Sequence, residues 1–276
     1  MPSLTRRVRD LRRRLLVKPN TKVNLGAIDP GETSHVGDKE VAKEQLKHDA
    51  EAIDVLQDRL YAESKRAVLI VLQGMDTSGK DGTVRSVFKK TGPLGMSVTA
   101  FKKPSEAELA HDFLWRIHKA CPERGTIGIF NRSQYEDVLI GRVRQLASPE
   151  VIEHRYDQIN AFEDMISSST RIVKFMLHIS KDEQRERLQS RLDEPHKHWK
   201  FDPADVEERK RWGDYQDAYE VMLSRCSTKG APWYVIPADK KWARNAAIAT
   251  IVRATLEEMD PRYPSVDWDP ADFKLD

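Results

Sequence analysis

The feature that most constrains this chain is an apolar run that ends in a glycine-containing loop. Residues 67–73 read AVLIVLQ, and residues 74–80 follow at once with the letters GMDTSGK. A continuous apolar run of this length is typical of a strand that helices cover on both faces. The spacing G-x-x-x-x-G-K after such a strand is typical of a phosphate-binding loop. The segment therefore predicts an α/β fold with a phosphate site at one strand end.

The loop has a physical rationale for binding phosphate. A tight turn between strand and helix aims backbone N–H groups into one concavity, and Gly74 and Gly79 let that backbone approach phosphate oxygens without a Cβ clash. Lys80 adds a positive charge, and the following helix adds the positive end of its dipole. The alternative is a plain strand–turn–helix junction that spells the motif by chance. We favour the phosphate loop because strand, loop and helix all fall where the motif requires.

One position departs from the usual motif. A Ser or Thr normally follows the lysine and its hydroxyl holds magnesium, but here Asp81 stands at that position. The metal must then be held differently, and Asp76 inside the loop is the candidate ligand. A carboxylate there would repel bare phosphate unless a cation lay beside it. We expect Mg²⁺, with Mn²⁺ as a substitute.

The rest of the chain alternates short strand patterns with helical ones. The further strands are expected at residues 97–101, 126–130, 172–179 and 233–236. Helices are expected at 39–65, 106–119, 150–166, 181–192 and 203–224, with a capping box formed by Ser180 and Glu183. This alternation predicts a three-layer αβα sandwich with a parallel five-stranded sheet and right-handed crossovers. We expect one domain, residues 1–276, with an N-terminal arm and helix at 1–65 and a mobile lid insertion at 182–212.

A second polar cluster follows the expected strand at 126–130. It contains Asn131, Arg132, Tyr135 and Glu136. Ligands bind at the carboxyl ends of strands in open parallel sheets, so this cluster should lie beside the phosphate loop. A capped helix start with acids at its N-terminal dipole would explain the same residues without any ligand. Spacing alone does not choose between these explanations.

Several motifs, taken in order, resemble the polyphosphate kinase 2 family. Residues 73–82 and 130–135 are similar to its Walker A and Walker B regions. The resemblance continues through FKKPS (101–105), HDFLWR (111–116), KF and LHIS (174–175 and 177–180), WKF (199–201), APW (231–233) and PAD (237–239). It covers roughly residues 18–260, nearly the whole chain. Departures at 89–93 and 167–170 do not touch the loop.

The resemblance implies phosphoryl transfer between inorganic polyphosphate and nucleotides, with magnesium, on a thymidylate-kinase-like P-loop kinase fold with a basic helical lid. Residues 135–139 (YEDVL) resemble the subgroup that acts on both AMP and ADP. Related subgroups that prefer one nucleotide tend to carry Asn where Glu136 stands. The implied reaction gives ADP from AMP and ATP from ADP, reversibly and by direct in-line transfer.

Phosphoryl transfer is mainly a matter of positioning and charge neutralisation, which suggests a role for each polar residue. We expect Lys80 and Arg132 to hold the phosphates, and Asp76 with its metal to orient the accepting phosphate. Glu136 is the candidate for organising a second metal or a water near AMP. The residues expected to bind nucleotide or phosphate are Gly74, Thr77, Gly79, Asp81, Gly82, Asn131, Tyr135, Arg187, Arg191 and Lys200.

The basic residues of the expected lid have a second explanation. Acids in the same segment nearly cancel their charge, so each base can also belong to a solvated helix face. Helical spacing favours function, because Gln184, Arg187 and Arg191 share one face. Closure of such a lid would exclude water from the reaction.

Composition limits the partners. With 46 Lys and Arg against 44 Asp and Glu, the net charge is +2, so no general affinity for nucleic acid is expected. Cys121 and Cys226 show no disulfide or metal-ligand pattern, and we expect two buried thiols. No apolar run approaches the roughly 20 residues of a membrane span. We expect a cytoplasmic homo-oligomer, a dimer or tetramer, with no membrane partner.

The Arg-rich segment 5–16 is amphipathic and lacks the apolar region of a secretory signal. A transit peptide or a membrane-surface helix is one explanation, and a solvated helical arm is the one we favour.

Two other functions stay open on the sequence. An ATP-dependent nucleoside monophosphate kinase would share the loop and fold but would not use long-chain polyphosphate. A nucleotide-dependent regulator or nucleic-acid binder would hydrolyse slowly, bind RNA or DNA tightly and transfer little to AMP. The near-neutral net charge and the lack of aromatic-rich basic repeats disfavour the second of these.

Overall fold

A five-stranded, all-parallel sheet lies at the centre of the computed structural model, which describes residues 4–273 and 275. The strand order is β2-β3-β1-β4-β5. In chain order the strands are β1 (Ala67–Gln73), β2 (Met96–Ala100), β3 (Ile127–Asn131), β4 (Thr170–His178) and β5 (Trp233–Pro237). All five expected strands are confirmed, with bounds shifted by at most two residues. The strand that carries the phosphate loop is the middle one.

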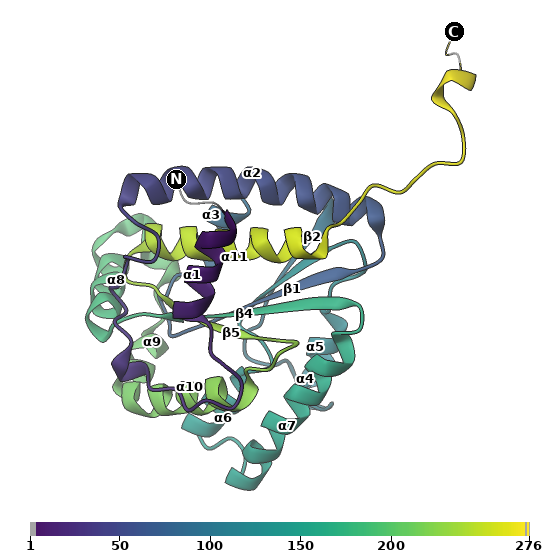
Figure 1. Cartoon of the computed structure of the whole chain (residues 1–276). Coiled ribbons are helices and arrows are strands. Elements are labelled where there is room, and N and C mark those ends of the chain that lie inside the picture. The colour runs from purple at the N-terminus through teal and green to yellow at the C-terminus, as the bar shows by residue number, and fades with distance from the viewer. Residues whose placement is uncertain (1–3, 274, 276) are drawn as a thin grey trace.

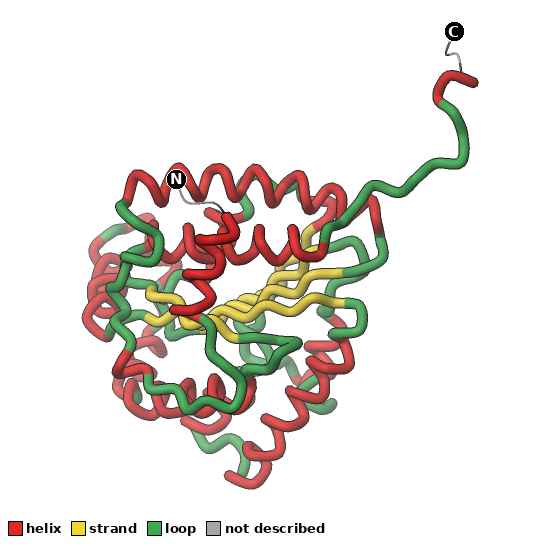
Figure 2. The backbone as a smooth tube through the Cα atoms, in the orientation of Figure 1, coloured by secondary structure: helices red, strands yellow, loops and turns green. Residues whose placement is uncertain are grey.

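Helices cover both faces of the sheet, so the expected αβα sandwich is confirmed (Figures 1 and 2). One face packs against α1 (Leu4–Leu15), α2 (Lys39–Glu63), α3 (Lys80–Val87) and α11 (Lys241–Met259). The other packs against α5 (Trp115–Lys119), α6 (Glu136–Val143), α7 (Pro149–Ile166) and α10 (Trp212–Cys226). The remaining helices are α4 (Glu106–Leu109), α8 (Lys181–Asp193), α9 (Pro203–Lys210) and the 3-10 turns η1 (Leu25–Ala27), η2 (Pro93–Gly95), η3 (Pro195–Lys200) and η4 (Pro270–Asp272). Within the described residues, no helix combines the length and apolar character needed to cross a membrane.

Strand β1 explains why the chain needs an uninterrupted apolar run. Val68, Ile70 and Leu72 belong to the core on the α2 and α11 side, whereas Leu69 and Val71 belong to the core on the α7 and α10 side. Side chains alternate between the two faces of a strand, and here both faces are covered. Every position therefore requires an apolar residue until Gln73, where the site begins.

Helix α1 belongs to the core, so the expectation of a solvated arm was wrong. Val8, Leu11 and Leu15 are buried, and the helix packs against α11 and β5. Arg12 forms an ion pair of 2.6 Å with Glu258 on α11. The arginines lie on the polar face of the helix. The apolar residues at three- and four-residue spacing form the opposite face, and this face packs against the rest of the protein.

Two helices expected to be continuous are each broken. Residues 106–119 form α4 and α5, separated by a turn in which the Asp112 side chain accepts the Leu114 amide at 2.9 Å. The second helix is divided at Arg211, between α9 and α10. The Arg211 guanidinium donates to the Val143 carbonyl of α6 at 3.1 Å, so this break holds α10 beside α6.

The start of α8 is fixed to the end of β5. Ser180 caps the helix as expected, because its hydroxyl accepts a hydrogen bond of 3.0 Å from the Glu183 backbone N–H. The second bond of the expected capping box, from the Ser180 backbone N–H to the Glu183 side chain, is absent. Instead the Ser180 N–H donates to the Asp239 carboxylate at 2.8 Å, and Glu183 pairs with Arg187. The first turn of α8 is thus tied to the chain that follows β5.

A buried ionic network joins β4 to α7. Lys174 is fully buried, pairs with Glu163, and donates to the Tyr135 hydroxyl at 2.7 Å and to the Cys226 carbonyl at 2.8 Å. The Tyr135 hydroxyl in turn donates to Glu163 at 2.7 Å. Because Tyr135 immediately precedes α6, the network holds the start of that helix in place.

Removing one charge of this network should be costly. We expect Lys174→Met to lower the free energy of unfolding by about 3–5 kcal/mol, because Glu163 would remain buried without its partner. Urea denaturation followed by circular dichroism measures this. The matched control is Lys210→Met, which removes an exposed pair with Glu207 and should leave stability nearly unchanged. Equal effects of the two substitutions would contradict the assignment.

Candidate active site

The two polar clusters meet at the carboxyl edge of the sheet. The loop of residues 74–80 leads from β1 into α3, and Asn131 ends the neighbouring strand β3. Leu72 and Asn131 are register partners, and the Arg132 amide donates to the Leu72 carbonyl at 3.0 Å. The expectation that the second cluster lies beside the loop is therefore met.

Both glycines of the loop are required by geometry. Gly74 has φ of +149°, and a Cβ there would lie 2.7 Å from the Leu177 carbonyl oxygen. Gly79 has φ of +101°, and a Cβ there would lie 2.0 Å from an Arg244 guanidinium nitrogen. Positive φ is costly for residues that carry a Cβ, and here the space is also filled. The loop also holds Thr77 at φ of +65°.

Lys80 lies folded over the loop. Its Nζ donates to the Gly74 carbonyl at 2.7 Å, and its side chain is buried. Burial first, and then the positive charge of Arg132, lower the Lys80 pKa to about 8, partly opposed by Asp76 and Glu136. A phosphate beside this ammonium would favour its charged form, so the lysine is well suited to an anionic ligand.

Arg132 lies between two carboxylates. Its guanidinium donates to Asp76 and, at 3.1 Å, to Glu136. The other Glu136 oxygen accepts from the Gln73 amide at 2.9 Å. The charge of Glu136 is the largest cause that raises the Arg132 pKa, and Asp76 adds to it against burial. The structure thus brings the four expected catalytic residues together, with Lys80 completing the set.

The donors at the site fit a hard divalent cation. Asp76 and Glu136 offer carboxylate oxygens on either side of one guanidinium. The part of the chain that the structure describes has no group of three or more His, Cys, Asp or Glu side chains placed to hold a metal. Mg²⁺ is usually held by one or two carboxylates together with substrate phosphates, which is the arrangement available here.

Two hydroxyls in the loop have no hydrogen-bond partner among the described residues. They are Thr77 Oγ1 and Ser78 Oγ, and both atoms are buried. Buried hydroxyls in native proteins are normally paired. A ligand in the loop would supply the missing partner, which agrees with the expected role of Thr77.

The other residues expected to bind nucleotide or phosphate, apart from those of the lid, differ in how close they lie to the phosphate loop. Asn131 donates its side-chain amide to Asp81, so these two expected residues contact each other. Gly82 lies in the first turn of α3, where a Cβ would be 3.5 Å from Arg244. Tyr135 is fully buried with its hydroxyl in the Glu163 network, so the structure does not bring it to the loop cavity.

The expected lid residues are not equivalent. Arg187 lies against the loop itself, donating to the carbonyls of Thr77 and Ser78 at 2.9 and 3.2 Å. Arg191 donates to the Lys200 carbonyl at 2.7 Å and pairs with Asp205 at 3.0 Å. Only the first of the three expected bases touches the loop.

The lid segment nevertheless comes close to the site. Burial first, and then the negative charge of Asp76, raise the pKa of Asp205 on α9 to about 6. The Gln184 amide of α8 donates to the Asp76 carbonyl at 3.1 Å. The sequence analysis placed Gln184 on the same helix face as Arg187 but did not predict its bond to the loop, and it missed Asp205, because nothing in the local pattern says which loop a helix will cover.

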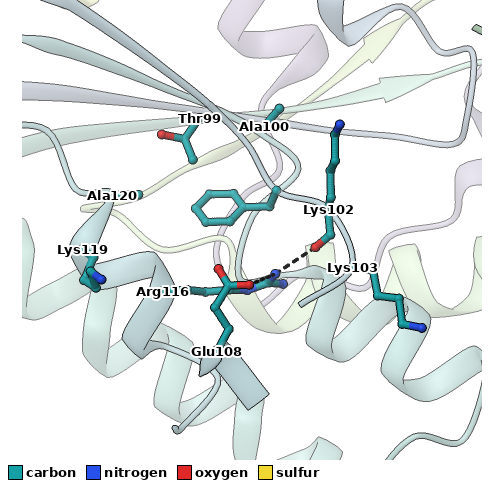
Figure 3. Close-up of a pocket in the computed structure, with 9 residues that line it drawn as sticks. Thr99, Ala100, Lys102, Lys103, Glu108, Arg116, Lys119 and Ala120 are labelled. Carbon is teal, nitrogen blue, oxygen red and sulfur yellow. Dashed lines mark hydrogen bonds and ion pairs between the residues drawn. The ribbon is translucent and has the colours of Figure 1, made fainter. Parts of the chain in front are cut away.

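A basic cavity adjoins the second cluster at the end of β2. Its volume is about 480 Å³, and its lining includes Lys102, Lys103, Arg116 and Lys119 with Glu108 as the acid (Figure 3). The Arg116 guanidinium donates to the Lys102 carbonyl at 2.9 Å and packs over the Phe101 ring.

Sequence analysis found only part of this cavity. The motifs that resemble the family include the segments that contain Lys102 and Arg116, but no role was predicted for Arg116 or Lys119. The signal for them was their three-residue spacing on α5, which puts both on one helix face. Ala100 and Asn131 are register partners, so the cavity lies next to the Arg132 cluster.

Comparison with known proteins agrees with this geometry. Residues 36–264 match the family model described as Polyphosphate kinase 2 (PPK2). An AMP/ADP-polyphosphate phosphotransferase of Meiothermus ruber is 49% identical over 250 residues, covering 90% of this chain and 94% of the relative. An ADP-polyphosphate phosphotransferase of Rhodopseudomonas palustris is 44% identical over 260 residues, covering 88% of this chain and 89% of the relative.

A solved structure gives the same result for the fold. The crystal structure of Polyphosphate Kinase 2 from Arthrobacter aurescens TC1 superposes with a TM-score of 0.89 at 42% sequence identity, covering 93% of this chain and 95% of that one. The phosphate loop, the adjoining Arg132 cluster and these matches lead to one conclusion. The chain belongs to the polyphosphate kinase 2 family.

Proposed function

We propose that this chain transfers phosphoryl groups from inorganic polyphosphate to AMP and ADP, giving ADP and ATP. The observation that carries the proposal is the site in which Lys80 and Arg132 face Asp76 and Glu136 beside a phosphate loop. The relative from Meiothermus ruber carries both AMP and ADP in its name, and it matches over nearly its whole length. An ATP-dependent nucleoside monophosphate kinase is the alternative that shares this loop.

The residues of the site divide the work of transfer. Lys80 and Arg132 neutralise the oxygens of the travelling phosphoryl group, which carries little bonding to either side at the transition state. Asp76 would hold the metal, for which we propose Mg²⁺. When bound, this ion neutralises charge on the phosphate oxygens and helps to align the attacking and leaving oxygens. Glu136 orients the acceptor side, where AMP differs from ADP by one phosphate.

Ligand binding must replace ion pairs within the site by contacts with the ligand. In the structure Arg132 is paired with both carboxylates. Phosphate oxygens compete for this guanidinium, and a metal competes for the carboxylates. The basic cavity beside Asn131 adds Lys102, Lys103 and Lys119, which provide positive charge for substrate phosphates beyond the loop.

We also propose a cytoplasmic homo-oligomer, a dimer or tetramer. The two cysteines are free, which fits a reducing compartment. After α11 the chain extends away from the body (Figure 1). Tyr263, Trp268 and Phe273 in this segment are exposed. Exposed aromatic residues on such a segment favour contact with another copy of the chain.

The donor and acceptors can be tested in one assay. Purified protein with Mg²⁺, long-chain polyphosphate and AMP should form ADP first and ATP after it, as measured by nucleotide chromatography. ATP in place of polyphosphate should be a poor donor to AMP. Release of orthophosphate without nucleotide products would refute the proposal, and efficient transfer only from ATP would favour the nucleoside monophosphate kinase.

Lys80→Ala should retain the fold and lose activity. We expect kcat to fall by roughly 10²–10³-fold, the scale of removing one donor that stabilises developing charge. The control is Lys90→Ala, which removes an exposed lysine beyond α3 and should keep normal turnover. Near-normal activity of the Lys80 variant, with an unchanged circular dichroism spectrum, would overturn the loop assignment.

Glu136→Asn should separate the two acceptors. The resemblance places Asn here in subgroups that prefer one nucleotide, so we expect kcat/KM for AMP to fall about tenfold more than kcat/KM for ADP, a difference of about 1.4 kcal/mol in barrier. Steady-state rates with each acceptor at fixed polyphosphate measure this. Equal losses for AMP and ADP would remove the argument for dual acceptor use.

A further inference from the structure

Arg244 on α11 is a buried cation without an acidic partner. Its side chain is 1% exposed. One guanidinium nitrogen donates to the Ser78 carbonyl at 2.9 Å, and Nε and Nη2 donate to the Asn245 side-chain oxygen at 3.0 and 2.9 Å. Among residues 4–273 and 275, no Asp or Glu forms an ion pair with it. Neutral oxygens alone therefore solvate this charge, which is an expensive arrangement inside a protein.

A second arginine reaches the same carbonyl from a different helix. One guanidinium nitrogen of Arg187 on α8 donates hydrogen bonds to the carbonyls of Thr77 and Ser78. The other donates to the carbonyls of Ala238 and Asp239, at 2.9 Å each. The Ser78 carbonyl thus accepts from two guanidinium groups. These come from segments about 110 and 166 residues away along the chain.

The two arginines fix the direction of one peptide group. In a trans peptide the C=O of one residue and the N–H of the next point to opposite sides. Because the Ser78 carbonyl points at Arg187 and Arg244, the Gly79 N–H must point to the other side of the loop. That side is the concavity in which backbone N–H groups of such a loop meet phosphate oxygens.

The guanidinium of Arg244 also fills the space behind Gly79. A Cβ at Gly79 would lie 2.0 Å from Arg244 Nη1, so with Arg244 in this position only glycine fits at residue 79. Burial first, and then the charge of Arg187, lower the pKa of Arg244 to about 9. A phosphate on the far side of the peptide would supply the negative charge that the ligand-free protein lacks.

We propose that Arg244, together with Arg187, is a positioning residue for phosphoryl transfer. It holds the Ser78–Gly79 peptide from behind so that the Gly79 amide faces the phosphate, and its unpaired charge strengthens phosphate binding without touching the ligand. The inference rests on the proposed function only in that the loop binds substrate phosphates.

The test separates a positioning role from a merely structural one. Arg244→Met removes a buried charge that has no acid beside it, so the melting temperature of the ligand-free protein should stay the same or rise. The rise in melting temperature caused by inorganic tripolyphosphate with Mg²⁺ should shrink. We expect tripolyphosphate affinity by calorimetry, and kcat/KM with polyphosphate and ADP, to fall by roughly 10–100-fold.

The same helix offers a matched control. Arg253→Met also removes an arginine of α11, but this one pairs with Asp49 and Glu257. It should lower the melting temperature of the ligand-free protein and leave the tripolyphosphate-induced rise unchanged. Arg244→Lys keeps the charge and one donor, so it should recover part of the lost affinity.

Several outcomes would overturn the proposal. They are an Arg244→Met protein with wild-type tripolyphosphate affinity, or one that only loses stability as Arg253→Met does. If Arg244→Met does not fold, an Arg244→Lys protein that folds and binds tripolyphosphate with wild-type affinity would also overturn it. The binding measurements need no turnover, so absence of transfer to AMP in every protein would refute the proposed function and leave this test intact.

Discussion

A phosphate loop must turn its N–H groups to one side, and this requires that its carbonyl groups be satisfied on the other. The structure accounts for each carbonyl from Gly74 to Ser78. Lys80 bonds the first two, at 2.7 and 3.4 Å, and Gln184 bonds the third. Arg187 bonds the last two, and Arg244 adds a second bond to Ser78. The anion-binding surface thus depends on four side chains drawn from α3, α8 and α11.

The four expected catalytic residues are balanced in charge. Lys80 and Arg132 supply two positive charges, and Asp76 and Glu136 supply two negative ones. A substrate made of phosphate and a divalent cation brings both signs, so it can replace the internal pairs without leaving any group of the site unpaired. A bare anion or a bare metal would satisfy only half of the set. The arrangement therefore favours a metal-bound polyphosphate or nucleotide over either component alone.

Local chemistry made the centre of the fold predictable from sequence. The bounds of β1, the loop that follows it and its neighbour β3 come from apolar runs, glycine spacing and the rule for strand ends. Contacts between distant segments were not predictable in this way. Arg244 lies 166 residues beyond its partner Ser78, and no pattern near position 244 marks it as part of the site. Likewise the stripe of α1 shows that a helix face will be buried, but not that α11 and β5 will cover it.

Tyr135 shows a different limit of sequence reasoning. It stands inside a motif that resembles the family's site, so it was expected at the ligand. In the structure it lies in the core and holds the start of α6, the helix that presents Glu136. A motif identifies residues that a site needs. It does not say whether a residue contacts the ligand or supports another residue that does.

The anchoring of α8 limits how the expected lid can move. Ser180, Gln184 and Arg187 bind the end of β5 or the loop backbone, and Leu188 is buried behind them. Motion of residues before Leu188 would release the carbonyls of the phosphate loop and disturb the surface that the lid is meant to cover. A lid that closes over this site must therefore bend beyond Leu188. The first half of α8 then serves as part of the loop's support, and any closure would have to come from the later segment, which includes Lys200 and whose Arg209 is itself bonded to Gln184.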